Sequence, residues 1–342
     1  MKVAPILAEL DRRGRPGVLV HTGQHYDAAM SDVFFEELGI PEPDHHLEVG
    51  SASHAIQTAR VMEAFEPVLL AEKPDVVIVA GDVNSTVACA LVAAKLGVKV
   101  AHVEAGLRSR DWSMPEEVNR LVTDRLSQYL LAPSQDGVDN LLAEGYPKES
   151  IHFVGNVMVD TLLNNLERAK QRPILKELGV EPGGYAVLTL HRPSNVDDPE
   201  TLGQILEAIR HVGTRVPVLW PVHPRLRGRV RHLGLPQSVR LLNPAGYLDF
   251  IALQADAALV LTDSGGLQEE TTILGTPCLT LRNNTERPVT ITDGTNQLAG
   301  TDPTKIVFLA DKVLSGQTPP ALRPPLWDGH AAVRIVSQIS ST

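Results

Sequence analysis

One segment near the carboxyl end of the sequence restricts the fold more than any other. Residues 257–261 form an apolar run that predicts a buried strand, and residues 267–274 predict a helix that ends at Gly275. The turn Asp263-Ser264-Gly265-Gly266 lies between them. This order of elements is a strand, a turn of small residues and the start of a helix. It places free backbone N–H groups and the positive end of a helix dipole at the carboxyl edge of a sheet. The segment therefore predicts an anion site.

The side chains around this turn suit a nucleotide. Ser264 offers a hydroxyl, and the missing side chains of Gly265 and Gly266 let a phosphate approach the backbone. Glu270 lies one turn into the helix, where it could accept hydrogen bonds from a ribose. Arg287 follows the next predicted strand and could reach back to a diphosphate. The alternative interpretation is an ordinary N-capped helix start without a ligand.

Strand and helix patterns alternate along the whole chain, which predicts parallel sheets covered on both faces. Strands are expected at 17–21, 76–80, 98–103, 128–132, 151–154, 185–190, 217–222, 239–242, 257–261 and 278–281. Helices are expected at 3–10, 28–38, 55–72 and 85–96, and 41–50 is expected to be a loop. Residues 161–184 read as a charged connector. The predicted fold class is α/β, with two doubly wound, Rossmann-like domains facing a cleft.

Composition narrows the class of partner. The 342 residues are enough for two domains. The net charge is −10 and no Lys/Arg-rich block is present, which disfavours nucleic acid and anionic membrane surfaces as partners. Cys89 and Cys278 lie in apolar segments of different halves, which favours free thiols in a reducing cytoplasm over a disulfide. No apolar run is long enough to predict a membrane span.

Polar side chains recur where predicted strands end or the next helix begins. They are Asp82, Glu104, Glu116, Glu117, Arg120, His191 and His223. Each alone could be a helix cap or a solvated charge. Because ligands of open α/β sheets bind beyond the carboxyl ends of the strands, the recurrence predicts a catalytic site. The sequence has no G-x-S-x-G elbow, zinc-ligand spacing, Walker sequence or dinucleotide glycine fingerprint.

Several motifs, in chain order, resemble those of the non-hydrolysing UDP-N-acetylglucosamine 2-epimerases. They are His102-Val103-Glu104-Ala105-Gly106-Leu107-Arg108, Pro115-Glu116-Glu117-x-Asn119-Arg120, Gly155-Asn156, Thr262-Asp263-Ser264-Gly265-Gly266-x-Gln268-Glu269-Glu270, Thr285-Glu286-Arg287-Pro288 and Trp327-Asp328-Gly329. The resemblance implies a glycosyltransferase-B-like fold. It implies a sugar-side domain at 1–165, a UDP-side domain at 166–326, and a terminal helix at 327–342 that packs back on the first domain. It further implies a cytoplasmic homodimer that needs no cofactor and no metal.

The resemblance also implies an activity and a set of site residues. The family interconverts UDP-N-acetylglucosamine and UDP-N-acetylmannosamine, for cell-surface polysaccharide precursors, by eliminating and re-adding UDP through a 2-acetamidoglucal. Residues that match the family's catalytic groups are Asp82, Glu104, Glu116 and His191. Residues that match substrate or UDP contacts are Lys2, Arg120, Phe250, Ser264, Gly265, Gly266, Glu270 and Arg287.

The chain departs from the family pattern in three places. His191-Arg192-Pro193-Ser194-Asn195 replaces the commoner His-Arg-Arg-Glu-Asn. The site where bacterial members bind a second UDP-N-acetylglucosamine is matched at Gln24, His25 and Gln57, but Ile56 replaces an arginine. The family begins with a strand and a Gly-Thr-Arg-Pro-Glu turn, whereas this chain starts on the following helix. We therefore expect the first strand of the amino-terminal domain to be missing and the strand at 17–21 to border a gap.

Other functions remain open at this stage. An epimerase of a UDP-diacetamido-uronic acid would use the same motifs. A UDP-sugar glycosyltransferase of the same fold would need an acceptor site. A catalytically impaired fragment that only binds UDP-sugar would show neither reaction.

Overall fold

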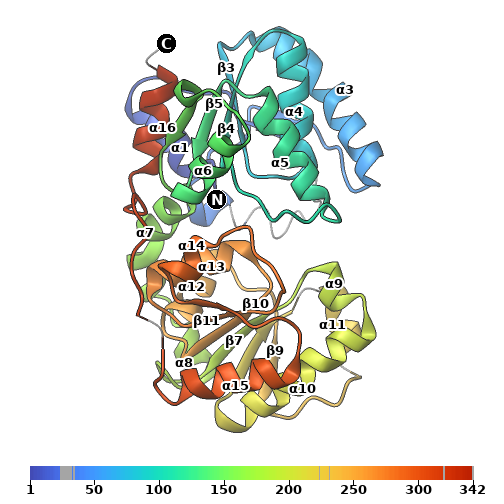
Figure 1. Cartoon of the computed structure of the whole chain (residues 1–342), viewed down its shortest axis with the longest axis vertical. Helices are drawn as coiled ribbons and strands as arrows, with labels where there is room; N and C mark the ends of the chain where they lie inside the picture. The colour runs from blue at the N-terminus through green and yellow to red at the C-terminus, as the bar shows by residue number, and fades with distance from the viewer. Residues whose placement is uncertain (24–32, 34, 223, 231, 319, 341–342) are drawn as a thin grey trace. The chain divides into compact units, whose positions relative to one another are not determined.

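The computed structural model describes residues 1–23, 33, 35–222, 224–230, 232–318 and 320–340 (Figure 1). These residues form two compact units. Unit 1 comprises Met1–Thr161 and Pro325–Thr342, and unit 2 comprises Leu162–Pro324. All strand pairs described in both units are parallel, which confirms the predicted α/β class with parallel sheets.

The described residues of unit 1 form two separate parallel sheets. The larger has the order β3 (Val76–Ala80), β4 (Lys99–Val103), β5 (Tyr129–Ala132), β6 (Ile151–Phe153), and the smaller pairs β1 (Val20–His21) with β2 (His45–His46). The strand expected at 17–21 is thus formed only at its end, and β2 lies inside the segment expected to be a loop. Within the described part of the chain, β3 is an edge strand, because β1 hydrogen-bonds β2 and not β3.

Helices cover the larger sheet of unit 1. They are α1 (Ala4–Arg12), α3 (His54–Glu72), α4 (Asn84–Lys95), α5 (Pro115–Leu126), α6 (Gln135–Ala143), the start of α7 (Val157–Lys170) and α16 (Ala331–Ser340). The carboxyl-terminal α16 lies beside the amino-terminal α1 (Figure 1), where Arg13 donates to the Val333 carbonyl and to the Ser337 hydroxyl at 3.0 Å. Ile6, Ile335 and Val336 are buried there, which ties the two chain ends into one core.

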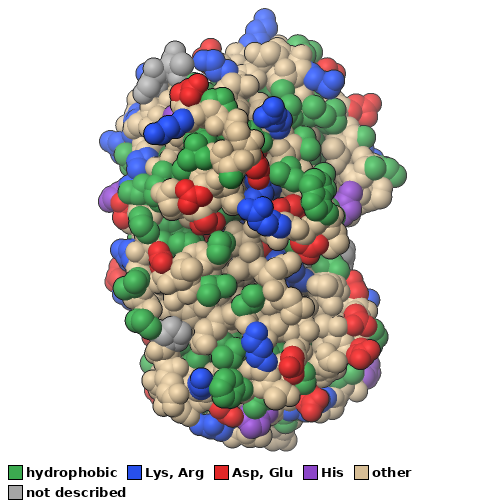
Figure 2. Space-filling view, viewed as in Figure 1, with side chains coloured by type: hydrophobic (Ala, Val, Ile, Leu, Met, Phe, Trp, Pro, Cys, Tyr) green, Lys and Arg blue, Asp and Glu red, His purple; other side chains and the backbone are tan. Residues whose placement is uncertain are grey.

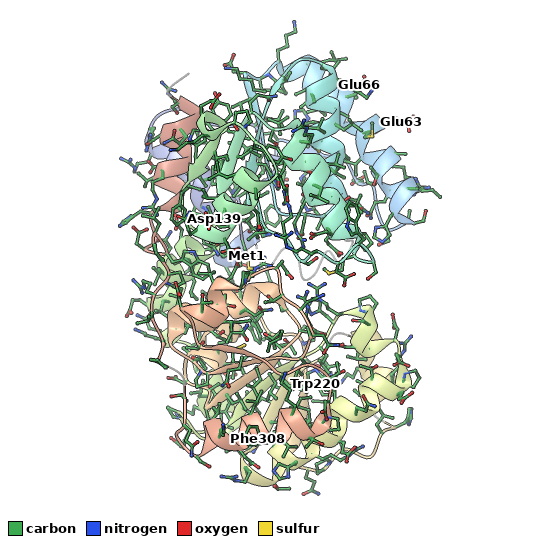
Figure 3. All side chains as sticks on the ribbon, viewed as in Figure 1. Met1, Glu63, Glu66, Asp139, Trp220 and Phe308 are labelled. Carbon is green, nitrogen blue, oxygen red and sulfur yellow. The ribbon has the colours of Figure 1, made fainter. Side chains whose placement is uncertain are left out.

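Unit 2 has one six-stranded sheet. Its order is β12 (Asn296–Leu298), β11 (Cys278–Thr280), β10 (Leu259–Thr262), β7 (Ala186–Thr189), β8 (Val218–Pro221), β9 (Val239–Leu242). Its helices are α8 (Ile174–Leu178), α9 (Pro193–Val196), α10 (Pro199–Arg215), α11 (Pro224–Val230), α12 (Tyr247–Ala255), α13 (Gly265–Leu274), α14 (Val289–Thr292) and α15 (Pro303–Leu314). Trp220 is fully buried in the core, whereas Phe308 on α15 faces outward and is 56% exposed (Figure 3).

Residues 161–184, which were expected to be a connector, are largely helical. Helix α7 continues to Lys170, and α8 follows after a short break at Pro173. The charged residues of α7 interrupt its apolar pattern, so the helix was not predicted from the sequence. Leu162 and Ala169 are nevertheless fully buried. Gly179 ends α8 in the left-handed conformation, at φ 60°.

The surface has the mixture of acidic and basic side chains expected from the composition. On the face shown in Figure 2, basic and acidic side chains are interspersed, without a large patch of one sign. Among the described residues, no helix is long and apolar enough to cross a membrane.

Candidate functional site

The parallel register of β3 and β4 brings two predicted carboxylates to one sheet edge. Ala80 pairs with Val103, so Asp82 and Glu104 both follow immediately beyond the paired ends. The Gly81 N–H donates to the Val103 carbonyl at 3.0 Å. Gly81 has φ +74°, and a Cβ there would lie 2.6 Å from Nζ of Lys2. Glycine suits this position, because its φ is positive and a side chain would displace the Lys2 ammonium.

Glu104 has an unusual backbone. Its φ is +76°, a conformation that costs a residue other than glycine on the order of 1–3 kcal/mol and concentrates at functional sites. The side chain is only 3% exposed, and its Oε2 lies 2.7 Å from Nζ of Lys2. A buried carboxylate held by a cation on strained backbone is a strong candidate for a catalytic group.

Arg120 joins Asp82 to the loop before α5. Its guanidinium lies 3.0 Å from Oδ2 of Asp82 and also pairs with Glu117. Glu117, which is 2% exposed, accepts from the backbone N–H of Ser109 at 2.9 Å and of Arg110 at 2.8 Å. Glu117 therefore fixes both the arginine and the loop.

Glu116 is placed differently from the other predicted carboxylates. It is half-buried in the first turn of α5, and no hydrogen bond between described residues joins it to Asp82 or Glu104. The structure thus pairs Lys2 with Glu104 and Arg120 with Asp82 at one sheet edge. Glu116 takes no part in these ion pairs.

A buried network that sequence reasoning missed lies beneath these carboxylates. Nδ1 of His102 is 2.6 Å from Oδ1 of Asp124, and Nε2 of His102 is 2.8 Å from the Gly81 carbonyl. The other oxygen of Asp124 accepts from the Gly106 N–H at 3.1 Å and from Arg108 at 2.7 Å. His102 lies in one of the motifs that resemble the family. Its partner Asp124 lies 22 positions further along the sequence and belongs to none of those motifs.

In unit 2 the predicted strand–turn–helix is formed by β10 and α13. Ser264 is the N-cap residue of α13, and its backbone N–H donates to the Thr262 hydroxyl at 2.9 Å. A Cβ on Gly265 would lie 2.5 Å from Nη1 of Arg287 and 2.6 Å from Oε1 of Glu286. The absence of a side chain at Gly265 is what allows Arg287 to sit against the start of the helix, which together with the helix dipole makes the turn attractive to an anion. Gly266 follows in the same turn, half-buried.

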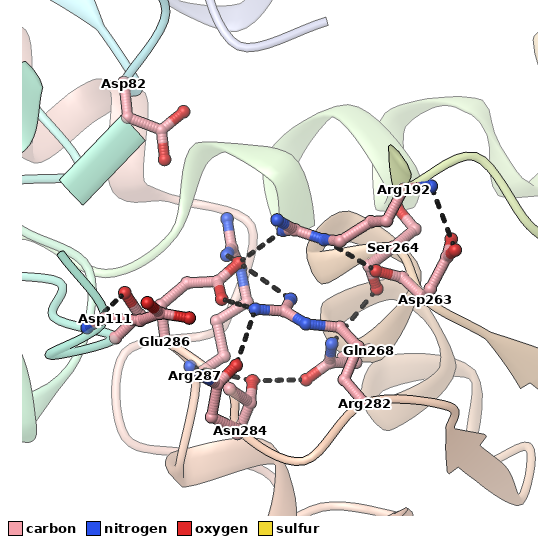
Figure 4. Close-up of polar contacts among 12 residues, drawn as sticks. Asp82, Asp111, Arg192, Asp263, Ser264, Gln268, Arg282, Asn284, Glu286 and Arg287 are labelled. Atoms are coloured by element: carbon pink, nitrogen blue, oxygen red, sulfur yellow. Dashed lines mark hydrogen bonds and ion pairs between the residues drawn. The ribbon is translucent and has the colours of Figure 1, made fainter. Parts of the chain in front are cut away.

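Arg287 is held by two carboxylates in a dense ionic network (Figure 4). Its Nε is 2.6 Å from Oε1 of Glu269, and its Nη1 is 2.5 Å from Oε1 of Glu286. Arg282 also pairs with Glu286, at 2.8 Å, and Arg192 lies 3.6 Å from it. Burial opposes ionisation of Glu286, but these guanidinium groups hold its pKa well below the usual range.

His191 is oriented by Asp263. Nδ1 of His191 lies 2.7 Å from Oδ1 of Asp263, while the histidine side chain is 58% exposed and the carboxylate is fully buried. Asp263 also accepts from the backbone N–H groups of His191 and Arg192 and from the Asn195 amide. Burial would raise the pKa of Asp263, but the hydrogen bond and charge of His191 lower it. Pro193 and Ser194, which replace Arg and Glu of the commoner family motif, are exposed.

Glu270 is packed inside unit 2. Its Oε1 accepts from the Tyr247 hydroxyl at 3.2 Å and its Oε2 from the Gln254 amide at 2.8 Å. Burial raises its pKa to about 7, against these two hydrogen bonds. Phe250, on the same helix as Tyr247 and Gln254, is half-buried and packs on the neighbouring apolar cluster.

The residues predicted for a second nucleotide-sugar site are only partly described. Gln24 and His25, like His223, lie outside the described residues. Gln57 is 5% exposed, donates to the Gly50 carbonyl at 2.9 Å and accepts from Asn84 at 2.8 Å. Ile56 is 51% exposed.

Known proteins resemble the whole chain. A family model described as UDP-N-acetylglucosamine 2-epimerase matches residues 8–340. The UDP-N-acetylglucosamine 2-epimerase of Methanococcus maripaludis is 42% identical over 348 residues, covering 98% of this chain and 94% of that protein. The UDP-2,3-diacetamido-2,3-dideoxy-D-glucuronate 2-epimerase of Pseudomonas aeruginosa is 45% identical over 287 residues, covering 83% of this chain and 80% of its own.

A solved structure agrees with these relatives. The crystal structure of Methanocaldococcus jannaschii UDP-GlcNAc 2-epimerase in complex with UDP-GlcNAc and UDP superposes with a TM-score of 0.92 and 41% identity. The match covers 100% of this chain and 96% of that one. It confirms the predicted pair of Rossmann-like domains of the glycosyltransferase-B type. The family expected from the motifs is confirmed as well: the chain belongs to the UDP-N-acetylglucosamine 2-epimerase family.

Proposed function

We propose that the chain is an isomerase that interconverts UDP-N-acetylglucosamine and UDP-N-acetylmannosamine. The observation that carries the proposal is the pair Asp82 and Glu104. These carboxylates follow adjacent strands of one sheet, and each is ion-paired with a cation, Arg120 or Lys2. Two carboxyl groups at one sheet edge are suited to moving a proton at a sugar carbon. The names of the relatives supply the substrate.

The chemistry of the substrate sets the order of bond breaking. The C2 proton of an N-acetylamino sugar is not acidic, because no carbonyl carbon lies next to C2. We propose that the C1–O bond breaks first and that its electron pair leaves with UDP. A carboxylate then takes the C2 proton, and the C–H electrons form the C1=C2 bond of a 2-acetamidoglucal. Protonation of C2 from the opposite face and return of the UDP oxygen to C1 give the epimer.

The groups of unit 1 are assigned to proton transfer at C2. Asp82, Glu104 and Glu116 are the proposed acid and base groups. Arg120 and Lys2 hold the first two in place. Glu104 has the strongest structural support, since its left-handed backbone is costly and thus calls for a functional explanation.

The groups of unit 2 are assigned to the nucleotide. Ser264, Gly265 and Gly266 form the proposed diphosphate turn, with Arg287 beside it. His191 is mostly exposed while anchored at Nδ1, so Nε2 is the nitrogen available to the departing phosphate, to which it donates when the ring carries both protons. Phe250 is assigned to the uracil side and Glu270 to the ribose. Stabilising the leaving diphosphate in this way lowers the barrier to C1–O cleavage.

A second substrate deserves a direct test. The Pseudomonas aeruginosa relative is named as an epimerase of a UDP-diacetamido-uronic acid and is 45% identical over its matched region. The same elimination chemistry would serve that substrate, whose uronate carboxylate adds a negative charge. Discrimination therefore depends on whether a cation meets the sugar's C6 group.

Two further properties belong to the proposal. We propose a homodimer, as the family resemblance implies, and a reducing cytoplasm. The second is supported by Cys89 and Cys278, which are both buried, free thiols. Sedimentation analysis of the purified chain would test the dimer.

The test of function is proton NMR of UDP-N-acetylglucosamine incubated with the protein in D2O. Epimerisation predicts a manno anomeric signal and deuterium at C2 of both sugars. Asp82→Asn should abolish both, whereas Asp139→Asn, at an exposed aspartate of unit 1 (Figure 3), should retain them. If neither signal appears with the unmodified chain, the proposed function is wrong. A parallel incubation with the diacetamido-uronic acid substrate decides between the two epimerases.

A further inference from the structure

We infer that His102 is a buried imidazolium that holds the two turns carrying Asp82 and Glu104 in register. The inference rests on the proposed function, because it takes those two carboxylates as catalytic. His102 itself is fully buried on β4, so it is a positioning residue.

The hydrogen bonds of the ring require both of its protons. Nδ1 faces a carboxylate oxygen of Asp124 at 2.6 Å, and Nε2 faces the carbonyl oxygen of Gly81 at 2.8 Å. A backbone carbonyl can only accept a hydrogen bond, and an ionised carboxylate can only accept one as well. A neutral imidazole has one N–H, so one of these buried contacts would place two acceptors against each other. With Asp124 ionised, only the doubly protonated ring satisfies both.

The remaining possibility is that Asp124 carries the proton and donates it to a neutral ring. The surroundings of Asp124 argue against this. Its Oδ2 accepts from Arg108 at 2.7 Å and from the backbone N–H of Gly106 at 3.1 Å. A guanidinium and a backbone donor at the same carboxyl favour the ionised form. Although burial alone would raise the pKa of Asp124, the charge and hydrogen bond of Arg108 act in the opposite direction.

The charges around the ring are balanced. Asp124 lies between the two cations His102 and Arg108, and Arg108 also pairs with Glu144 at 2.7 Å. The cluster therefore contains two positive and two negative groups. This balance matters because a single unpaired charge in this position would carry a large desolvation cost.

The pair of His102 and Asp124 connects the backbone before Asp82 to the backbone after Glu104. Through Nε2, His102 holds the carbonyl of Gly81, the residue directly before Asp82. Through Asp124, it holds the N–H of Gly106, in the turn that follows Glu104. Gly81 and Gly106 have φ of +74° and +82°, conformations that glycine adopts freely, so the hydrogen bonds from outside the turns are what hold these two glycines in place. One imidazolium–carboxylate pair thus fixes the separation of the two proposed acid and base groups.

The protonation state can be measured without any turnover. Proton–nitrogen NMR of protein labelled with 15N-histidine should show one ring with two slowly exchanging N–H groups at neutral pH. That ring is assigned by its disappearance in His102→Gln. His330→Gln, at an exposed histidine of unit 1, is the matched control and should leave the signals in place. A His102 ring with a single N–H would overturn the inference.

The positioning role has its own readout. In His102→Gln and in Asp124→Asn, we expect kcat for epimerisation to fall ~10- to 100-fold, because a small displacement of reacting groups is costly. KM for UDP-N-acetylglucosamine should stay within a factor of about three, since the diphosphate groups assigned above lie in unit 2. Asp124→Asn keeps the histidine and the side-chain volume, so it serves if the first variant does not fold.

Two outcomes would overturn the positioning role. In one, both variants are folded by circular dichroism and retain the kcat of His330→Gln. In the other, KM rises while kcat is unchanged. If the unmodified chain does not epimerise, the proposed function fails, and the NMR spectrum still decides the state of His102.

Discussion

Nδ1 of His191 lies 2.7 Å from Oδ1 of the fully buried Asp263, although more than half of the histidine side chain is exposed. Because Asp263 accepts the Nδ1 proton, Nε2 is left as the ring nitrogen available to a ligand. The same carboxylate accepts from the backbone N–H groups of His191 and Arg192. Asp263 therefore fixes both the orientation of the ring and the path of the chain that carries it.

The first prediction concerns this pair. Asp263→Asn keeps the shape of the side chain but removes the charge that favours an Nδ1 donor. We expect kcat for epimerisation to fall by about 100-fold, the scale of a general acid that has lost its orientation. UDP affinity, measured by calorimetry, should change far less. Asp256→Asn, at an exposed aspartate of the same unit, is the control. Equal kcat in both variants would show that Asp263 is structural only.

The second prediction isolates the strain at Glu104. Glu104→Ala and Glu104→Gly both remove the carboxylate, but only glycine adopts φ near +76° without cost. Thermal unfolding should find the glycine variant more stable than the alanine variant by about 1 kcal/mol. Both should be inactive.

The matched control for this comparison is Glu63, an exposed residue inside helix α3 (Figure 3). There the order should reverse, with glycine less stable than alanine by about 1 kcal/mol. If the alanine variant were the more stable at both positions, the left-handed backbone of Glu104 would not be a source of strain.

The third prediction separates binding from stability at Arg287. Arg287→Ala removes the cation that pairs with the buried Glu269 and one of the cations that pair with the buried Glu286, so we expect the free energy of unfolding to fall by about 3–5 kcal/mol. Arg172→Ala breaks the exposed pair with Asp249 and should cost no more than about 1 kcal/mol. Urea unfolding of the two variants makes the comparison.

UDP affinity at this position is better tested with Arg287→Lys, which keeps a positive charge. The ammonium cannot form the forked contact of a guanidinium, so we expect UDP binding to weaken by roughly 1.5–3 kcal/mol. An unchanged UDP dissociation constant in a folded Arg287→Lys variant would remove Arg287 from the proposed diphosphate site.

The parts of the site that the sequence could predict are those set by sheet topology. Asp82 and Glu104 follow apolar runs, and parallel strands end at a common edge, so their proximity could be expected. The turn at 263–266 could be expected for the same reason. Residues whose role depends on packing between elements could not be found this way. The pairing of His102 with Asp124 depends on how β4 lies against α5, across 22 positions of sequence.

The errors in secondary structure have a similar cause. Strand β12 contains the polar Asn296 and Gln297, so it lacks an apolar pattern. Asn296 is nevertheless 1% exposed, because its amide bonds Thr280, Gln268 and Thr290 inside the unit. A buried polar strand of this kind is stabilised by partners that are distant in sequence, which local periodicity does not detect.

The last prediction concerns the pH dependence of stability. Burial raises the pKa of Glu270 from 4.5 to about 7 in the folded chain. Between these values the folded state keeps a proton that the unfolded state has lost. The contribution of Glu270 to stability is therefore greatest below pH 4.5 and decreases as pH rises to about 7. For this fully buried group, the decrease should be on the order of 3 kcal/mol.

Glu270→Gln should remove this dependence, since the amide does not titrate. Its new N–H group can be accepted by Oε1 of Gln254, which has no hydrogen-bond partner among the described residues. The measurement is the free energy of unfolding from urea titrations at several values between pH 4.5 and 7.5. Glu207→Gln, at an exposed glutamate of α10, is the control and should keep the slope of the unmodified chain. The opposite result would be a difference in the free energy of unfolding between the unmodified chain and Glu270→Gln that stays constant over this pH range. It would show that Glu270 is ionised throughout and that its pKa is not raised.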